Sequence, residues 1–428
     1  MQTDLKRARF GWCLYDWANS AFATVILAAV LPVYFVALVP ESGAVISFGR
    51  WQHTLPASAL WGYGVSASMI VVAVLAPWLG ALADRRGLHK QLLILCCLGG
   101  AFATSLLFLL SHGQYLAAMA LFVIGNIGFS GGNIFYNAYL NIISVPGETD
   151  QLSARGYATG YVGGGLMLLI VFLMIQFSEP LGFSDKGEAT RFGFLLTGLW
   201  WLLFSLPTFK LLPATAPVTR PKLNPFKTYL NSFRDIIRYR DLCLFLIAFL
   251  FYNDGIQTVI AISAIFAREE LGLGQGTILG CFLMIQFLAM PGALLFGRLA
   301  KRFSAKLAIM GCLVLFTLVC GYAYRMQNSL EFWLLGAVIA LILGGSQAIS
   351  RSLFASMAPE KRSAEFFGFY SISARFAAIL GPLTFALVTD LSGSARGAIL
   401  TLAIFFIIGG SILMRVNVER GRLRAIQE

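Results

Sequence analysis

The feature that most constrains this chain is a succession of twelve long apolar runs separated by short breaks. Each run can cross a membrane as a helix, which takes roughly 20 residues. Only 12% of the 428 residues are charged, about half the roughly 25% typical of soluble proteins, so a soluble globular protein is excluded. We predict an all-α polytopic membrane protein. Its twelve transmembrane helices are expected at about 11–39, 57–82, 91–111, 115–145, 155–177, 191–212, 241–267, 275–299, 305–325, 331–358, 364–390 and 396–415.

The runs fall into two groups of six, which we expect to form an N-terminal bundle (1–212) and a C-terminal bundle (241–428) joined by a basic linker (213–240). The halves also share sequence. Gly131–Pro146 aligns with Gly344–Pro359 at a constant offset of 213, with a double glycine, a leucine and the final proline in common. This pattern indicates duplication of a six-helix unit and two pseudo-symmetric bundles.

Positive charge is distributed unevenly over the predicted loops. Of the 32 Lys and Arg residues, 24 lie in the two termini, the linker and the loops on the same side, and six lie in the alternate loops. Loops on the cytoplasmic side of a membrane carry such an excess, so both termini are expected in the cytoplasm. The remaining two, Arg351 and Arg375, lie inside predicted helices.

Polar side chains concentrate in every third predicted helix, where they are spaced three or four residues apart on one face. We predict that these four helices surround an aqueous transport pathway between the bundles. For a single Asn or Gln the alternative is an interhelical hydrogen bond worth about 1 kcal/mol. The candidate substrate- or ion-binding residues are Asp16, Asn19, Asn133, Asn137, Asp254, Gln257, Arg351 and Arg375.

Charges inside the membrane are expensive, so they indicate function or pairing. Asp254 and Arg375 lie near the middle of their helices, and a structural ion pair between them is the alternative to a role in binding. Asp16 lies about 13 Å from its helix midpoint, where gating is the alternative to binding. The lipid bilayer and a small-molecule substrate are the expected partners.

Other classes of function find no support in the sequence. The net charge of +12 comes without any nucleic-acid-binding motif. The three histidines, His53, His89 and His112, fall in predicted loops, and no metal-ligand or nucleophile–His–acid spacing is present. We therefore expect no enzyme activity, no metal and no cofactor.

The segment Gly80–Lys90, GALADRRGLHK, resembles the motif of the major facilitator superfamily between helices 2 and 3. The resemblance implies the major facilitator fold. It also assigns a gating role to Asp84 and Arg85, because in that superfamily the corresponding residues clamp the cytoplasmic ends of the two bundles in the outward-open state. Gly80 of the same motif is a further gating candidate. The corresponding segment of the second half has Lys301 where the aspartate would stand, so a symmetric clamp is not expected.

Further segments resemble the vacuolar-effluxer-like family, which includes the fungal autophagy-related amino-acid effluxer. They are Tyr15–Ala21, Phe251–Thr258, Gly344–Pro359 and Glu365–Tyr370. This resemblance implies a secondary transporter, with amino-acid efflux as the hint to its substrate. The short termini and loops are similar to the bacterial form of the family, which implies a bacterial inner (plasma) membrane.

The expected function is proton-linked or facilitative transport of a small polar organic solute, best matched by amino acids, by rocking of the two bundles. Arg351 or Arg375 would meet a carboxylate, and Asp254 an ammonium or the coupling proton. Tyr15 and Asp16 are candidates for the cytoplasmic gate. Siderophore or drug transport, a lipid flippase and a non-transporting sensor are the alternatives. We expect a monomer.

Overall fold

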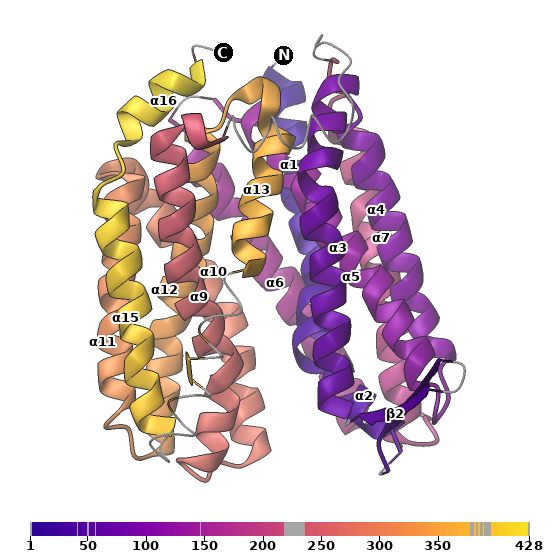
Figure 1. Cartoon of the computed structure of the whole chain (residues 1–428). Coiled ribbons are helices and arrows are strands. Elements are labelled where there is room, and N and C mark those ends of the chain that lie inside the picture. Colours follow the sequence, from indigo (N-terminus) through magenta and orange to yellow (C-terminus); the bar gives the residue numbers. More distant parts are fainter. Residues whose placement is uncertain are drawn as a thin grey trace. The chain divides into compact units, whose positions relative to one another are not determined.

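The computed structural model describes residues 2–40, 42–48, 51–55, 57–145, 147–217, 236–376, 381, 384–385, 388 and 395–426. These residues are almost all helical (Figure 1). The elements are α1 (Gln2–Ala21), the π-helix η1 (Phe22–Ala29), α2 (Leu31–Leu38), β1 (Ala44–Phe48), β2 (Trp51–Leu55), α3 (Ala57–Arg86), α4 (His89–Leu106), η2 (Leu107–Leu109), α5 (Tyr115–Ile143), α6 (Thr149–Gln176), α7 (Lys186–Leu211), α9 (Arg240–Glu269), α10 (Gln275–Arg302), α11 (Ala305–Ala323), α12 (Ser329–Met357), η3 (Glu360–Arg362), α13 (Ser363–Phe376), α15 (Ala395–Met414) and α16 (Val418–Ile426).

The membrane-spanning character predicted from the sequence is confirmed. Among the described residues, nine helices are long and apolar enough to cross a membrane. α3 adds a tenth candidate as a bent pair, Ala67–Ala76 and Trp78–Arg86, whose axes differ by 41° around Pro77, the residue type that most often kinks a helix. The span predicted at 11–39 corresponds to α1, η1 and α2 in succession. The span predicted at 364–390 lies only partly within the described residues.

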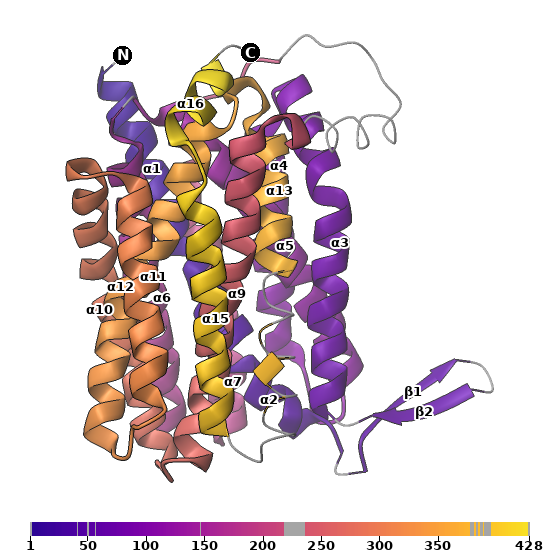
Figure 2. The same cartoon turned by 60° about the vertical axis from the view of Figure 1, so that its left-hand side comes forward.

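Three features differ from the sequence prediction. A short antiparallel hairpin, β1–β2, is formed where a loop was expected, with Val45 opposite Thr54, and it extends away from the neighbouring helices (Figure 2). His53 and His89 were expected in loops, but they lie in β2 and in the first turn of α4. A separate helix, α16, follows the last predicted span, because the nine residues Val418–Ile426 are amphipathic rather than apolar.

Local sequence sets several helix starts. Asp185 and Asn328 precede α7 and α12, and each side chain accepts a hydrogen bond from the backbone N–H three residues later. Glu188 and Glu331 accept in return from a backbone N–H just before each helix. This reciprocal arrangement satisfies backbone donors that the helix itself leaves open.

The described helices pack into two compact units. Unit 1 comprises Met1–Leu75, Leu88–Tyr136 and Thr159–Thr215, and unit 2 comprises Ala76–Gly87, Asn137–Ala158 and Ala216–Glu428. Unit 2 therefore contains one end of α3, of α5 and of α6 together with the helices that follow the linker. The division into bundles at 213–240 rests on the sequence repeat and stays a prediction.

Glycines allow close helix packing in both units. In unit 1, a Cβ on Gly163 would lie 2.4 Å from the Trp17 carbonyl oxygen, so α6 touches the α1 backbone. In unit 2, a Cβ on Gly344 would lie 2.2 Å from the Ala289 carbonyl oxygen, which brings α12 against α10. Such small residues permit helix contact in lipid, where the hydrophobic effect does not drive association.

Candidate functional site

The polar stripe of α1 lies against α5 in unit 1. Asp16 is 9% exposed, and its Oδ2 accepts a 2.9 Å hydrogen bond from the Tyr136 hydroxyl. Tyr136 is held in turn by Trp12, whose ring stacks on it at 4.6 Å and whose Nε1 donates to the Tyr136 carbonyl oxygen. The buried carboxylate of Asp16 thus accepts from a neutral hydroxyl group, and the ring that carries this hydroxyl is held in place by Trp12.

One turn along α1, Asn19 donates to Asn133 Oδ1 at 2.9 Å, so the two predicted stripes meet directly. Thr24 follows in the π-helix η1 and donates to the Gly164 carbonyl oxygen of α6 at 3.0 Å. Helix turns widened to π geometry are rare and are frequent at functional sites. The stripe of α1 is therefore bonded to both α5 and α6.

Two glycines make room for this cluster, which we name the unit 1 polar cluster (Asp16, Asn19, Thr24, Asn133 and Tyr136). A Cβ on Gly160 would lie 2.7 Å from Ser20 Oγ and 3.2 Å from Asp16 Oδ1. A Cβ on Gly132 would lie 2.7 Å from the hydroxyl of Tyr15, which is fully buried and packs on Tyr136 at 5.2 Å between ring centroids. Any larger residue at either position would displace a polar group.

Unit 2 contains a second buried carboxylate. Asp254 of α9 is fully buried, and its Oδ2 accepts a 2.8 Å hydrogen bond from the backbone N–H of Gly381. Gln257, three residues further along α9, is half-buried. The side chain of Arg375 lies outside the described residues, so the predicted pairing of Asp254 with Arg375 stays untested.

Arg351 of α12 is 2% exposed and is held by neutral groups on α5 and α6. Its Nε and Nη2 donate to the side-chain and backbone oxygens of Ser153 at 2.9 and 2.8 Å. Its Nη1 donates to Asn137 Oδ1 at 3.3 Å, and its guanidinium lies 4.2 Å from the ring centroid of Tyr157. The planar, multiply donating guanidinium suits this combination of hydrogen bonds and stacking.

Further contacts bind the same stretch of α6 to α10 and α12. Ser153 donates to the Ala348 carbonyl oxygen at 2.7 Å, and Ser352 donates to Asp150 Oδ1 at 2.5 Å. A core of small side chains fills the space between these helices. Its members are Ala154, Ala158, Ala293 and Ala348, with Tyr157, Met290 and Leu294 packed against them.

The motif residues of α3 meet the start of α13, also in unit 2. Asp84 is 5% exposed and accepts hydrogen bonds from the backbone N–H groups of Ala364 and Glu365 at 3.2 and 3.0 Å. The carboxylate therefore caps α13 at its positive end. Gly80, one turn earlier, allows the approach, because a Cβ there would lie 2.4 Å from the Ala364 carbonyl oxygen.

The start of α13 carries its own ion pair. Arg362 and Glu365 are both buried and form two hydrogen bonds of 2.9 and 2.6 Å. Ser363 donates to the Ala138 carbonyl oxygen and accepts from Asn141, which ties α13 to α5. Arg85 is half-buried and, among the described residues, makes no hydrogen bond.

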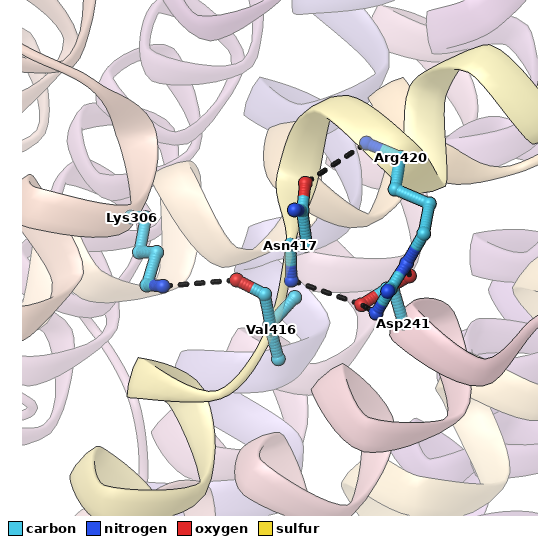
Figure 3. Close-up of polar contacts among 5 residues, drawn as sticks. All are labelled: Asp241, Lys306, Val416, Asn417 and Arg420. Atoms are coloured by element: carbon cyan, nitrogen blue, oxygen red, sulfur yellow. Dashed lines mark hydrogen bonds and ion pairs between the residues drawn. The ribbon is translucent and has the colours of Figure 1, made fainter.

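α16 fastens the end of the chain to unit 2. Arg420 forms a two-pronged ion pair with Asp241 at the start of α9, with distances of 2.6 and 2.8 Å, and Asn417 donates its backbone N–H to the same carboxylate (Figure 3). Lys306 of α11 donates to the carbonyl oxygens of Met414 and Val416. α16 is thus bound to the start of α9, and α11 holds the turn between α15 and α16.

Several of these groups were missed by the sequence analysis. Tyr136, Ser153 and Asp150 were not among the candidate residues. Tyr136 bonds to Asp16 and Ser153 bonds to Arg351, both of which were candidates. Asp150 bonds to Ser352, the residue next to Arg351. Asp150 and Ser153 lie in the first turns of α6, which begins six residues before the apolar run that marked it. Asp150 and Ser153 are three residues apart, a spacing that places both on one face of a helix and could have predicted the earlier start of α6.

The sequence is similar to a family of membrane transporters over nearly its whole length. The sequence matches the family described as "Vacuole effluxer Atg22 like" over residues 4–146 and 144–426. The uncharacterized MFS-type transporter YxiO of Bacillus subtilis is 34% identical over 95% of this chain and 94% of its own length. Autophagy-related protein 22-1 of Aspergillus niger is 23% identical over 98% of this chain and 90% of its own length.

Solved structures of major facilitator transporters share the fold. The human organic anion transporter MFSD10 has a TM-score of 0.72 and 18% identity, over 96% of this chain and 99% of that one. The proton:xylose symporter XylE has a TM-score of 0.72 and 13% identity over the whole of both chains. These likenesses show that the chain has the major facilitator fold.

Proposed function

Because the chain belongs to the vacuole effluxer Atg22-like family of major facilitator transporters, we propose that it moves a small polar organic solute across the membrane by alternating access, with amino acids as the favoured substrates. The observation that carries this proposal is the unit 1 polar cluster. Its carboxylate and amides lie in helices that otherwise face lipid or other helices, where polar groups persist mainly for function.

An amino acid offers an ammonium and a carboxylate, and the chain has a candidate group for each. The carboxylates of Asp16 and Asp254 are the proposed partners of the ammonium. Arg375 is the proposed partner of the carboxylate, because Arg351 already donates to Ser153 and Asn137. Asn19, Asn133 and the half-buried Gln257 would add neutral hydrogen bonds.

Proton coupling is proposed for Asp254. Its carboxylate is buried in the middle of α9 and accepts from the backbone N–H of Gly381, a donor whose own charge does not change with pH. A carboxylate buried in this way can exchange a proton with a solute or with water that enters the pathway. Asp16, bonded to the neutral Tyr136, is the second candidate for this role.

The gate is proposed to be the packing of residues 76–87 and 137–158 on the helices of unit 2. Asp84 caps α13, and Arg351 fastens α12 to α6, so both would have to release when this side opens. Arg85 is proposed to take part only in another conformation. The excess of Lys and Arg in the loops on this side supports a cytoplasmic position for it in a bacterial plasma membrane, with both termini on the same side. A monomer suffices for this mechanism.

The test is uptake by liposomes that contain the purified full-length protein, screened with a labelled amino-acid mixture with and without an imposed pH gradient. We expect accumulation that the gradient increases. Asp254→Asn should abolish the increase and leave slow downhill flux, whereas Glu179→Gln, which alters an exposed carboxylate, should behave as wild type. No accumulation of any amino acid would overturn the substrate class, and an unchanged gradient response in Asp254→Asn would overturn the coupling role.

A further inference from the structure

An apolar groove lies between α10 and α11 in unit 2. It has a volume of about 180 Å³ and is lined by Phe296, Leu299, Phe303, Leu307, Ala308 and Gly311. None of these side chains can form a hydrogen bond. Phe303 and Leu307 are 65% and 61% exposed at its mouth. The groove therefore matches a hydrocarbon chain rather than a polar solute.

The helix ends beside the groove carry a concentration of positive charge. Arg298, Lys301, Arg302 and Lys306 all fall within nine residues, and no acidic residue occurs between Glu270 and Glu331. Lys306 donates hydrogen bonds to the backbone carbonyl oxygens of Met414 and Val416. The other three are exposed and, in the described part of the chain, have no carboxylate partner.

One of these cations is fixed at the mouth of the groove. The guanidinium of Arg302 lies 5.7 Å from the ring centroid of Phe303, which is itself a lining residue. Arg298 lies one turn earlier on the same side of α10, since four residues advance a helix by about 400°. Lys301 points some 100° away from Arg302 around the helix, so it is a weaker candidate for contact with anything in the groove.

The depth of the groove is suited to a lipid molecule. Phe296 and Phe303 are seven residues apart, which is about 10 Å along α10. Phe303 stands at the turn that joins α10 to α11, on the side that the charge count predicts to be cytoplasmic. In that orientation the groove would span the last two helix turns below the membrane surface, at the level of the glycerol group and the upper part of an acyl chain.

We propose that this groove binds an anionic phospholipid of the cytoplasmic leaflet. One acyl chain lies along Phe296, Leu299 and Gly311, and the phosphate pairs with Arg302 and Arg298. Cations without acidic partners favour a headgroup of net negative charge over a zwitterionic one, because a choline or ethanolamine group would bring a further cation into the same place. The proposal is independent of the transported substrate.

The glycines of α11 provide a matched pair of variants. A Cβ on Gly311 would have no atom within 4 Å, so the backbone there has room for a side chain, and Gly311→Leu adds one to the lining of the groove. Gly321 lies ten residues along the same helix, has the same open surroundings and is not a lining residue. Gly321→Leu therefore makes the same chemical change away from the groove. Arg302→Gln has its counterpart in Arg415→Gln, which alters an exposed arginine at the end of α15.

The experiment is native mass spectrometry of the full-length protein in detergent, titrated with phosphatidylglycerol or phosphatidylcholine of identical chains. We expect the first phosphatidylglycerol to bind at least tenfold more tightly than phosphatidylcholine. The affinity for this first phosphatidylglycerol should fall at least fivefold in Gly311→Leu and in Arg302→Gln. It should stay within twofold of the wild-type affinity in Gly321→Leu and in Arg415→Gln.

Three outcomes would overturn the proposal. Equal binding of the two lipids would mean a non-selective lipid annulus. Equal affinity of Gly311→Leu and Gly321→Leu for phosphatidylglycerol would mean that no acyl chain enters the groove. Displacement of phosphatidylglycerol by glycerol 3-phosphate at comparable concentration would mean that the cations bind a soluble phosphate.

Discussion

The hydroxyl of Tyr136 donates a 2.9 Å hydrogen bond to the carboxylate of Asp16. The two residues are 120 positions apart in sequence, and their contact joins α5 to α1 within unit 1. Because Tyr136 is neutral, it orients the carboxylate while leaving its negative charge uncompensated by this bond. The bond therefore fixes the direction of the carboxylate without adding a counter-charge.

Tyr136→Phe should leave the fold intact and slow transport. The ring keeps its stacking on Trp12, and only the hydrogen bond to Asp16 is lost. A hydrogen bond to a charged group contributes roughly 1.5–3 kcal/mol, so uptake by liposomes is expected to fall by about tenfold or more. Tyr322→Phe, which alters a half-exposed tyrosine on α11, is the control. Equal uptake by the two variants would refute a role for this contact.

Gly381→Ala should destabilise the protein through Thr258. The added Cβ would lie 2.0 Å from Thr258 Oγ1 and 3.0 Å from Asp254 Oδ1. Overpacking of this kind costs about 1–3 kcal/mol. The melting temperature of the purified protein should fall, and the double variant Gly381→Ala/Thr258→Ala should recover part of the loss. A double variant with the sum of both single losses would exclude the proposed clash.

Arg351→Lys should loosen the start of α6 almost as much as Arg351→Ala. A lysine cannot donate to Ser153 and Asn137 together or stack on Tyr157 in the same way. We expect amide hydrogen exchange in residues 149–158 to be roughly tenfold faster, which corresponds to a loss of about 1.4 kcal/mol of local stability. Arg415→Ala is the control, and unchanged exchange in Arg351→Lys would show that its charge alone suffices.

Asp84→Asn should weaken the cap of α13 and Asp84→Ala should remove it. The carboxylate accepts from two backbone N–H groups, and asparagine has one acceptor oxygen. Loss of a helix cap costs about 0.5–2 kcal/mol. The melting temperatures should therefore fall in the order wild type, Asp84→Asn, Asp84→Ala. The same temperature for all three would mean that the cap contributes nothing to the folded state.

Arg420→Ala should have a small effect that depends on salt. Arg420 is 54% exposed, so its pair with Asp241 is screened by solvent and contributes little to stability. Hydrogen bonding to that carboxylate raises the pKa of Arg420, so the guanidinium stays charged throughout the physiological pH range. Proteolysis of α16 in low salt should be faster in Arg420→Ala than in wild type, and the difference should shrink in high salt. Arg424→Ala is the comparison.

The apolar runs were sufficient to predict most spans, because lipid demands about 20 apolar residues from any helix that crosses it. The polar stripes predicted that Asn19 and Asn133 line one aqueous pathway. The two side chains are hydrogen-bonded to each other, and the pathway stays a prediction. The start of α6 was placed too late because Asp150 and Ser153 are polar, although both are helical. Hydropathy cannot distinguish a polar residue in a loop from one in a buried helix turn.

Long-range partners were beyond the sequence for a different reason. Gly381 lies 127 residues from Asp254, and Asp84 lies 280 residues from Ala364, so neither contact follows from local spacing. The short hairpin β1–β2 has no long alternating pattern to mark it. α16 lacks the length of a span, and its contacts with Asp241 depend on the course of α15.

The fastening of residues 76–87 and 137–158 to unit 2 has an energetic consequence. Asp84 bonds to backbone N–H groups, and Arg351 bonds to a serine, an asparagine and a backbone carbonyl oxygen. Water can replace each of these neutral partners. We expect this to lower the cost of separating the segments in the transport cycle proposed above. A solute that binds the associated and separated arrangements with unequal affinity can reverse their populations.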